Sequence, residues 1–231
     1  MHHDEAPTAE PPTLSMRLHD ETADVHDAAE RAPFITNLLE GGLTIDAYVL
    51  LLAQYLPVYR ALETTAARYR YDPVIGDLVP AALDRAAAIE HDLRVLGGDA
   101  ADAIEPTAAT ADYVARITET SADWPGGFVA HHYVRYLGDL SGGQIIRRIL
   151  SRHYGLTDDR GLSFYVFDDI DNGVQFKKRY RAALDRAPWG PAEQDRIVEE
   201  ARRAFEHNLA VFASLDGSAA ALAGAGGPAD I

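Results

Sequence analysis

Apolar residues recur every three to four positions along almost the whole chain, and this spacing constrains the fold more than any other feature. Such a repeat is typical of helices that bury one face against a core. Alternating apolar and polar runs, which predict strands, are nearly absent, and the one β-like run is SFYVF at 163–167. Five residues do not make a sheet, so the sequence predicts an all-α fold, a single-domain helical bundle.

The apolar repeat and the positions of glycine and proline divide the chain into expected helices. These cover about residues 14–32, 45–62, 79–96, 110–120, 128–154, 173–186 and 191–215. Pro57 should kink the second of them or locally break its hydrogen bonding, because proline lacks the amide hydrogen that the helix needs. Residues 156–172 are expected to be mostly loop. No linker or repeat divides the chain, so we expect one domain over 14–216 with flexible ends at 1–13 and 217–231.

Charge and cysteine content exclude several classes of function. The chain has 36 acidic and 21 basic residues, a formal net charge of −15, and is therefore a poor general binder of nucleic acid. The absence of Cys excludes a disulfide scaffold, a thiolate metal site and a catalytic thiol. The N-terminal residues do not look like a signal peptide, and no apolar run reaches the roughly 18–20 residues that span a bilayer. We therefore expect a cytoplasmic location and no membrane partner.

Three glycines within six residues distinguish the helix expected at 128–154. Gly138, Gly142 and Gly143 each cost roughly 0.5–1 kcal/mol relative to alanine inside a helix. Gly138 and Gly142 are four residues apart, so they share a face, and Gly143 would widen this bare strip. The strip could admit a flat ligand against the backbone, or it could serve close packing of two helices.

Polar side chains lie beside these glycines. Asp139 follows Gly138, and Arg135 stands four residues before Asp139, so the two can pair. Tyr133 and Tyr136 add further polar groups. A surface ion pair would explain the charged residues alone, but their mixture with glycines indicates a pocket that holds water.

His26 is a candidate metal ligand at the edge of the apolar face of the first helix. A single histidine there could also be a core residue with its hydrogen bonds satisfied. Glu30, one turn later, could accept the Nδ1–H and leave Nε2 free for a metal. One histidine holds a bare ion poorly, but it can hold haem iron, because the porphyrin supplies four further ligands.

The densest basic cluster is FKKRYR at 176–181, which contains both lysines of the chain. It could be a solvated helix face or a seat for an anionic ligand.

Several segments carry a family resemblance. VAHHYVRYLGDLSGGQ at 129–144 resembles the distal-helix signature of the haem oxygenases, especially the bacterial members used in iron acquisition. Further matching segments are ETADVHDAAE, YLPVYRALE, FKKRYRAAL and ARRAFEHNLAVF, at 21–30, 55–63, 176–184 and 201–212. The resemblance covers roughly residues 14–215, and the segments occur in the family's order.

The resemblance implies an enzyme that opens haem with O2 and a reductant. Haem b would be both substrate and cofactor, held between a proximal helix and a kinked distal helix. The products would be biliverdin, of the IXα isomer, CO and Fe²⁺. The chain has no flavin or dinucleotide motif, so the electrons would come from a separate reductase or ferredoxin. The protein is expected to be a monomer. A docking face could include Arg147, Arg148 and Arg152, although a solvated helix end would explain them equally.

The resemblance also implies a role for each matching residue. His26 would be the axial ligand of the iron, oriented by Glu30. Gly138, Gly142 and Gly143 would face the haem, and a network of Asp139, Arg135 and Tyr59 would lie beside bound O2. The propionates would meet Lys177, Arg181 and Tyr133, and the pocket wall would include Phe205, Asn208 and Phe212.

One departure affects the expected haem anchoring. Family members often have a propionate-binding Lys on the proximal helix, where this chain has His19 or Ala23. Arg17 could substitute for it. The carbon at which the ring opens depends on this anchoring.

Two other functions remain compatible with the sequence. One is a carrier or sensor that binds haem without turning it over. The other is a helical domain of the thiaminase-like fold without haem, although such enzymes generally use a Cys nucleophile and this chain has none.

Overall fold

The computed structural model describes residues 11–157 and 159–225, and every regular element within them is a helix. The predicted all-α fold is therefore confirmed. The extension expected at 1–13 lies outside the described residues up to position 10, as do residues 226–231 of the expected tail. No helix in the described part of the chain is long and apolar enough to cross a membrane.

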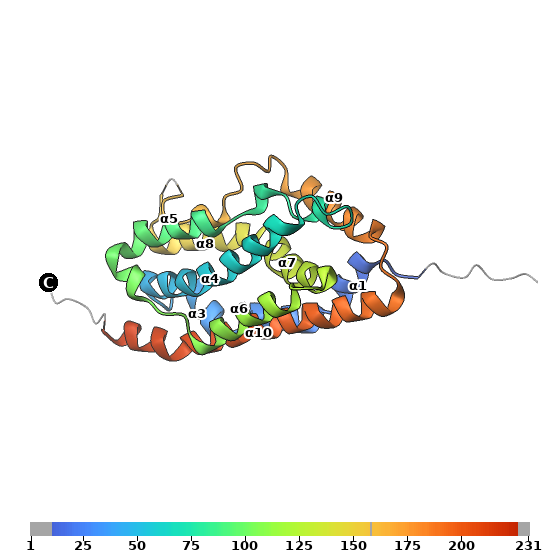
Figure 1. Cartoon of the computed structure of the whole chain (residues 1–231). Coiled ribbons are helices and arrows are strands. Elements are labelled where there is room, and N and C mark those ends of the chain that lie inside the picture. Colours follow the sequence, from blue (N-terminus) through green and yellow to red (C-terminus); the bar gives the residue numbers. More distant parts are fainter. Residues whose placement is uncertain (1–10, 158, 226–231) are drawn as a thin grey trace, which may run out of the picture.

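The order of the helices can be followed along the coloured chain in Figure 1. The α-helices are α1 (Leu14–Asp20), α2 (Ala23–Glu30), α3 (Pro33–Leu39), α4 (Ile45–Tyr69), α5 (Ala86–Gly97), α6 (Ala108–Thr120), α7 (Pro125–Asp139), α8 (Gly143–Tyr154), α9 (Gly173–Arg186) and α10 (Pro191–Ala225). Short 3₁₀ helices are η1 (Gly76–Leu78), η2 (Ala81–Leu83), η3 (Gly98–Ala103) and η4 (Ser163–Tyr165). The β-like run at 163–167 thus contains η4 and no strand.

Two long helices organise the bundle. α10 runs along one side of the molecule and packs against α7, α6, α3, α4 and α2. α4 crosses the middle and packs against α5 and α6, so it separates the α10 side from the α5 side (Figure 1). α4 also continues through Pro57 as one helix. α7 lies between α10 and α4, and nearly all of its residues are buried.

The ends of several helices follow from local capping. Thr13 caps α1, Thr107 caps α6 and Asn172 caps α9, each by accepting a hydrogen bond from a backbone amide of the first turn. Pro33 and Pro125 occupy the first turns of α3 and α7, where the missing amide hydrogen costs nothing.

The first predicted helix is in fact two helices, α1 and α2, separated by Glu21 and Thr22. The buried Thr22 hydroxyl donates to the carbonyl oxygen of Leu18 at 2.6 Å. This side-chain bond competes with the regular backbone pattern and accompanies the break. The prediction of one continuous helix to Pro33 was therefore wrong.

Three other predicted helix boundaries were wrong. The helix expected over about 45–62 continues to Tyr69. The helix expected from 79 begins at Ala86, because the Glu63 carboxylate accepts from the backbone amides of Arg85 and Ala86 and fixes the start there. The last helix, expected to end at 215, continues to Ala225 through the alanine-rich run 219–223. Alanine has the highest helix propensity of all residues.

The most informative correction concerns the helix expected at 128–154. It is divided into α7 and α8 by Leu140, Ser141 and Gly142. The Lys177 ammonium donates to the Ser141 hydroxyl at 2.8 Å and to the Leu140 carbonyl oxygen at 3.4 Å. These contacts of Lys177, on α9, stabilise the non-helical conformation of the residues between α7 and α8. The glycines lie at the ends of helices, where their cost is smaller than in a helix interior.

Candidate functional site

His26 lies on α2 with about half of its side chain, 49%, exposed. This exposure argues against the alternative of a satisfied core residue. Phe205 of α10 meets the imidazole edge-on, with 5.7 Å between ring centroids. The ring is thus steadied on one side by α10 and is otherwise accessible to a ligand.

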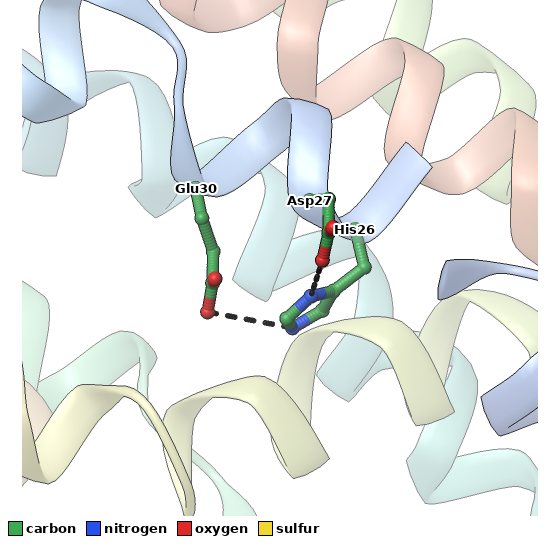
Figure 2. A group of neighbouring side chains, drawn as sticks. All are labelled: His26, Asp27 and Glu30. Atoms are coloured by element: carbon green, nitrogen blue, oxygen red, sulfur yellow. Dashed lines mark ion pairs between the residues drawn. The ribbon is translucent and has the colours of Figure 1, made fainter. Parts of the chain in front are cut away.

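Two carboxylates flank this imidazole. Figure 2 shows His26, Asp27 and Glu30 projecting from α2, with ion pairs from the ring to both acids. Glu30 Oε1 lies 3.7 Å from Nε2, and Asp27 Oδ1 lies 3.8 Å from Nδ1. The prediction that Glu30 faces Nδ1 was therefore wrong. The glutamate, one turn along the helix, reaches the far nitrogen of the ring, and the short aspartate faces the near one.

Gly138 and Gly142 present bare backbone to open space. A Cβ atom built on Gly138 would meet nothing within 4 Å, and one on Gly142 would meet only the Gly138 carbonyl oxygen, at 3.7 Å. Gly138 is also exposed, although α7 is otherwise buried from Gly126 to Asp139. The predicted bare strip is present at these two positions.

Gly143 does not belong to this strip. A Cβ there would lie 3.0 Å from Cδ1 of the Tyr165 ring. Close packing against the 163–165 segment therefore explains this glycine, and the predicted haem contact of Gly143 is not supported.

The network around Asp139 is buried. Tyr59 of α4 donates its hydroxyl hydrogen to Asp139 Oδ2. Arg135 donates to the Tyr59 oxygen from Nη2 at 2.9 Å and lies 4.0 Å from Asp139 Oδ1. Burial raises the pKa of the Asp139 carboxyl above its ordinary value, while the charge of Arg135 and the hydrogen bond from Tyr59 oppose that shift. These contacts join Asp139, Arg135 and Tyr59, and the place of the three beside bound O2 stays a prediction.

Asn208 and Tyr55 complete this network. Arg135 donates from Nη1 to Asn208 Oδ1 at 2.6 Å, so Asn208 binds the network in addition to any role in the wall. The guanidinium also lies 4.2 Å above the Tyr55 ring, against which Phe212 packs at 6.5 Å. Tyr55 was not among the predicted site residues. Its spacing of four residues from Tyr59, on the same helix face, was the signal available in the sequence.

α10 brings the two halves of the site together. Phe205 contacts His26, and Asn208, three residues later on the same face, binds Arg135. The exposed imidazole of α2 and the polar network of α7 therefore lie along one face of α10.

The two cations of 176–181 that were expected to meet the propionates, Lys177 and Arg181, differ in their contacts with the described residues. Lys177 holds the α7–α8 break, and burial together with neighbouring Arg181 lowers its pKa. Arg181 makes no ion pair with any described residue. Tyr133, 8% exposed, lies close enough to Arg181 for the guanidinium charge to oppose the rise in its pKa that burial causes.

The two proximal side chains considered in the sequence, His19 and Arg17, already have acidic partners. His19 is exposed and lies 2.7 Å from Asp20. Arg17 forms ion pairs with Glu21 at 2.7 Å and Asp195 at 2.8 Å. Arg17 therefore does not stand free as a substitute for the missing lysine.

Comparison with known proteins decides which family this site belongs to. The family model described as heme oxygenase matches residues 12–214. The chain belongs to the haem oxygenase family. It is 38% identical to heme oxygenase 1 of Rattus norvegicus over 205 residues, which cover 87% of this chain and 71% of the relative. It is 36% identical to heme oxygenase 1 of the cyanobacterium Nostoc, over 89% of this chain and 87% of the relative.

Solved structures agree with this assignment. A crystal structure of heme oxygenase-1 from the cyanobacterium Synechocystis in complex with heme matches with a TM-score of 0.87 and 34% identity. The match covers 93% of this chain and 97% of that one. Members of the family are haem-degrading oxygenases, so the protein is an enzyme of this class. This decides against a thiaminase-like domain and against a carrier without turnover.

Proposed function

We propose that His26 is the axial ligand of the iron, and that the haem lies between α2 and the α7–α8 break. The main supporting observation is that α10 contacts both the exposed imidazole of α2, through Phe205, and the polar network of α7, through Asn208. Beside that network, Gly138 and Gly142 leave the backbone open to a flat group. The residues present fit haem, because a large planar ligand needs both a free axial donor and bare backbone opposite it. When bound, haem supplies the iron that activates O2 and is itself the substrate.

The network of Asp139, Tyr59 and Arg135 holds and delivers protons at the Gly138 side of the site. Asp139 adjoins the bare strip, and its raised pKa favours retention of a proton above the usual range of a carboxyl. Tyr59 orients this carboxyl group through its hydroxyl. Arg135 donates to the Tyr59 oxygen and so positions Tyr59. Arg135 is itself positioned by its contacts with Asn208 and the Tyr55 ring. Because these three side chains are buried and bonded to one another, their polar atoms are held in place beside the proposed position of O2.

A hemin titration of the purified chain tests this assignment. We expect a complex that saturates at one haem per chain, with the absorption spectrum of a histidine-ligated haem. Titration without a saturable spectral change would contradict the proposed site.

Gly138→Leu should abolish or strongly weaken haem binding. The Cβ position is open and the backbone is helical, so the new side chain leaves the fold intact but occupies the place of the flat ligand. Gly190→Leu is the control, because its Cβ also meets nothing within 4 Å. Gly190 precedes α10 at the end where Glu193 contacts Trp124, the residue before α7, whereas Gly138 lies at the opposite end of α7. Hemin titration and thermal unfolding measure both effects. Normal haem affinity in Gly138→Leu would place the haem elsewhere.

Lys177 and Arg181 anchor the propionates, and their geometry selects the IXα isomer. Replacing both with methionine should weaken haem binding by about a hundredfold or more, because two charge-assisted contacts of roughly 1.5–3 kcal/mol each are lost. The double variant should also yield a mixture of biliverdin isomers. Lys178→Met is the control, since Lys178 is an exposed neighbour on the same helix. Chromatography of the product gives the isomer ratio. A single unchanged isomer from the double variant would exclude these residues from anchoring.

Electrons come from a separate ferredoxin or flavoprotein reductase. Arg148 and Arg152 of α8 are exposed and make no ion pair with described residues, whereas Arg147 is paired with Asp159. The predicted basic docking face therefore reduces to Arg148 and Arg152, which an acidic donor could contact at low ionic strength.

A further inference from the structure

A buried hydrogen bond joins the middle of α7 to α9. Nδ1 of His132, on α7, lies 2.9 Å from the hydroxyl oxygen of Tyr180, on α9. The two rings are nearly parallel, with 2° between their planes and 5.9 Å between their centroids. Both side chains are almost fully buried, with 1% and 2% of their surface exposed. Ring stacking and burial therefore hold this contact in one geometry.

The contact between His132 and Tyr180 is also insensitive to pH. Burial lowers the pKa of His132 to about 3 and raises the pKa of Tyr180 well above its ordinary value. Both groups are therefore neutral over the pH range in which most proteins work. The hydrogen bond stays the same across that range, so it can serve as a constant link between the two helices.

The residues that follow this pair are two of the proposed propionate contacts. Tyr133 follows His132 on α7, and Arg181 follows Tyr180 on α9. The Arg181 guanidinium lies close enough to Tyr133 for its charge to oppose the rise in pKa that burial causes. Two consecutive positions of α7 thus lie beside two consecutive positions of α9. A shift of α9 that broke the first contact would also move Arg181 relative to Tyr133.

Only two side-chain hydrogen bonds link the described residues of α9 to α7 and the break that follows it. α9 packs chiefly against α1 and η1. Lys177 reaches Ser141 between α7 and α8, and Tyr180, one turn later, reaches His132. The ammonium of Lys177 is also assigned to a propionate, so its bond to Ser141 competes with the ligand. The bond between Tyr180 and His132 is independent of haem.

We propose that His132 and Tyr180 are positioning residues that fix α9 on α7 and thereby select the carbon at which the haem ring is opened. The proposal rests on the proposed function, since it requires Lys177 and Arg181 to hold the propionates. Cations that hold the propionates set how far the ring is turned in its own plane, whereas Asp139 has a fixed place on α7. The position of α9 relative to α7 therefore decides which edge of the ring faces Asp139.

Tyr180→Phe tests this with the smallest change, because it removes the hydroxyl and keeps the stacked ring. We expect a mixture of biliverdin isomers in place of one. The haem methyl groups should also show altered chemical shifts in the NMR spectrum of the ferric complex, because these shifts report the in-plane orientation of the ring. Haem affinity should fall by no more than about tenfold, since one neutral hydrogen bond is lost and both cations remain. One unchanged isomer with unchanged methyl shifts would overturn the proposal.

Tyr154→Phe is the matched control. The Tyr154 hydroxyl donates to the carbonyl oxygen of Leu43 at 2.9 Å, at the end of α8 opposite Gly143. This variant also loses a tyrosine hydrogen bond between distant segments, but α9 takes no part in that bond. Thermal stability should fall, while the isomer and the methyl shifts should stay the same. A change of isomers as large as in Tyr180→Phe would mean that any loosening of the bundle alters the product, and the proposal would fail.

A double variant, His132→Leu with Tyr180→Phe, separates the position of α9 from the stability of the fold. The single variant leaves Nδ1 of His132 buried without its partner, which is destabilising, whereas the double variant replaces both polar groups by apolar ones. Thermal unfolding should show that much of the lost stability returns. The isomer mixture should persist, because no directional contact fixes α9. Return of a single isomer together with the stability would contradict the proposal.

Replacement of both Lys177 and Arg181 by methionine distinguishes failure of this proposal from failure of the proposed function. An unchanged isomer from that variant would show that these cations do not anchor the propionates. Mixed isomers from that variant, together with one unchanged isomer from Tyr180→Phe, would leave the anchoring intact and overturn only the role of His132 and Tyr180. Chromatography of the products and NMR of the haem complexes give both results.

Discussion

Asp139→Asn is expected to bind haem normally and to form biliverdin roughly 10²- to 10⁴-fold more slowly, the range in which a positioned proton-transfer group acts. The substitution keeps the shape of the side chain and removes the group that can take and release a proton. Tyr59 loses its carboxyl acceptor, so the buried network no longer presents a proton-carrying group beside the bare strip at Gly138. Hemin affinity should remain, because Asp139 lies beside the proposed haem position and holds neither the iron nor a propionate.

The rate of biliverdin formation under O2 with a chemical reductant measures this effect. Asp169→Asn, at an exposed position between α8 and α9, is the control and should keep the rate of the unaltered chain. Thermal unfolding shows whether the buried Asn itself disturbs the fold. Biliverdin formation by Asp139→Asn at the normal rate would refute the proton-handling role.

His26→Ala is the second variant with a large expected effect. It removes the only protein donor proposed for the iron, so the axial ligation should disappear from the absorption and resonance Raman spectra. The haem should bind at least tenfold more weakly, which corresponds to about 1.4 kcal/mol, and biliverdin formation should stop. The bare strip and the cations of α9 would still hold the ring, so binding should not vanish.

His19→Ala is a control on the neighbouring helix, because that histidine is exposed and pairs with Asp20. It should leave both spectra unchanged. A spectrum of His26→Ala that matches that of the unaltered chain would remove His26 from the site.

The sequence predicted features that depend on residues close together in the chain. The apolar repeat predicted helices, and the cost of glycine in a helix drew attention to Gly138 and Gly142. Adjacent residues of an α-helix point in different directions, and the neighbouring His131 and His132 of α7 have different partners. His131 meets Glu200 at 3.0 Å, and His132 meets the Tyr180 hydroxyl at 2.9 Å.

Features that depend on distant residues could not be predicted from the sequence. The division between α7 and α8 is held by Lys177, whose ammonium reaches Ser141 from α9. Gly143 appeared to extend the bare strip until the packing of Tyr165 was known. Which imidazole nitrogen of His26 lies near Asp27 and which lies near Glu30 depends on side-chain rotation. The spacing of these residues in the sequence does not determine it.

The site around Arg135 shows the same limit. Pairing with Asp139 followed from a spacing of four residues. The contacts of Arg135 with Tyr55, Tyr59 and Asn208 come from α4 and α10, and they depend on how three helices pack. Family resemblance supplied Tyr59 and Asn208 as candidates, but it did not supply the geometry that connects them.

Turnover of the haem complex tests the central claim most directly. The purified chain with one equivalent of haem is incubated with ascorbate under O2 while the absorption spectrum is recorded. We expect the Soret band to disappear as the absorption of biliverdin develops, with CO released and no reaction in the absence of O2. A Soret band that persists, or that is lost without formation of a bile pigment, would contradict the conclusion that this site opens the haem ring.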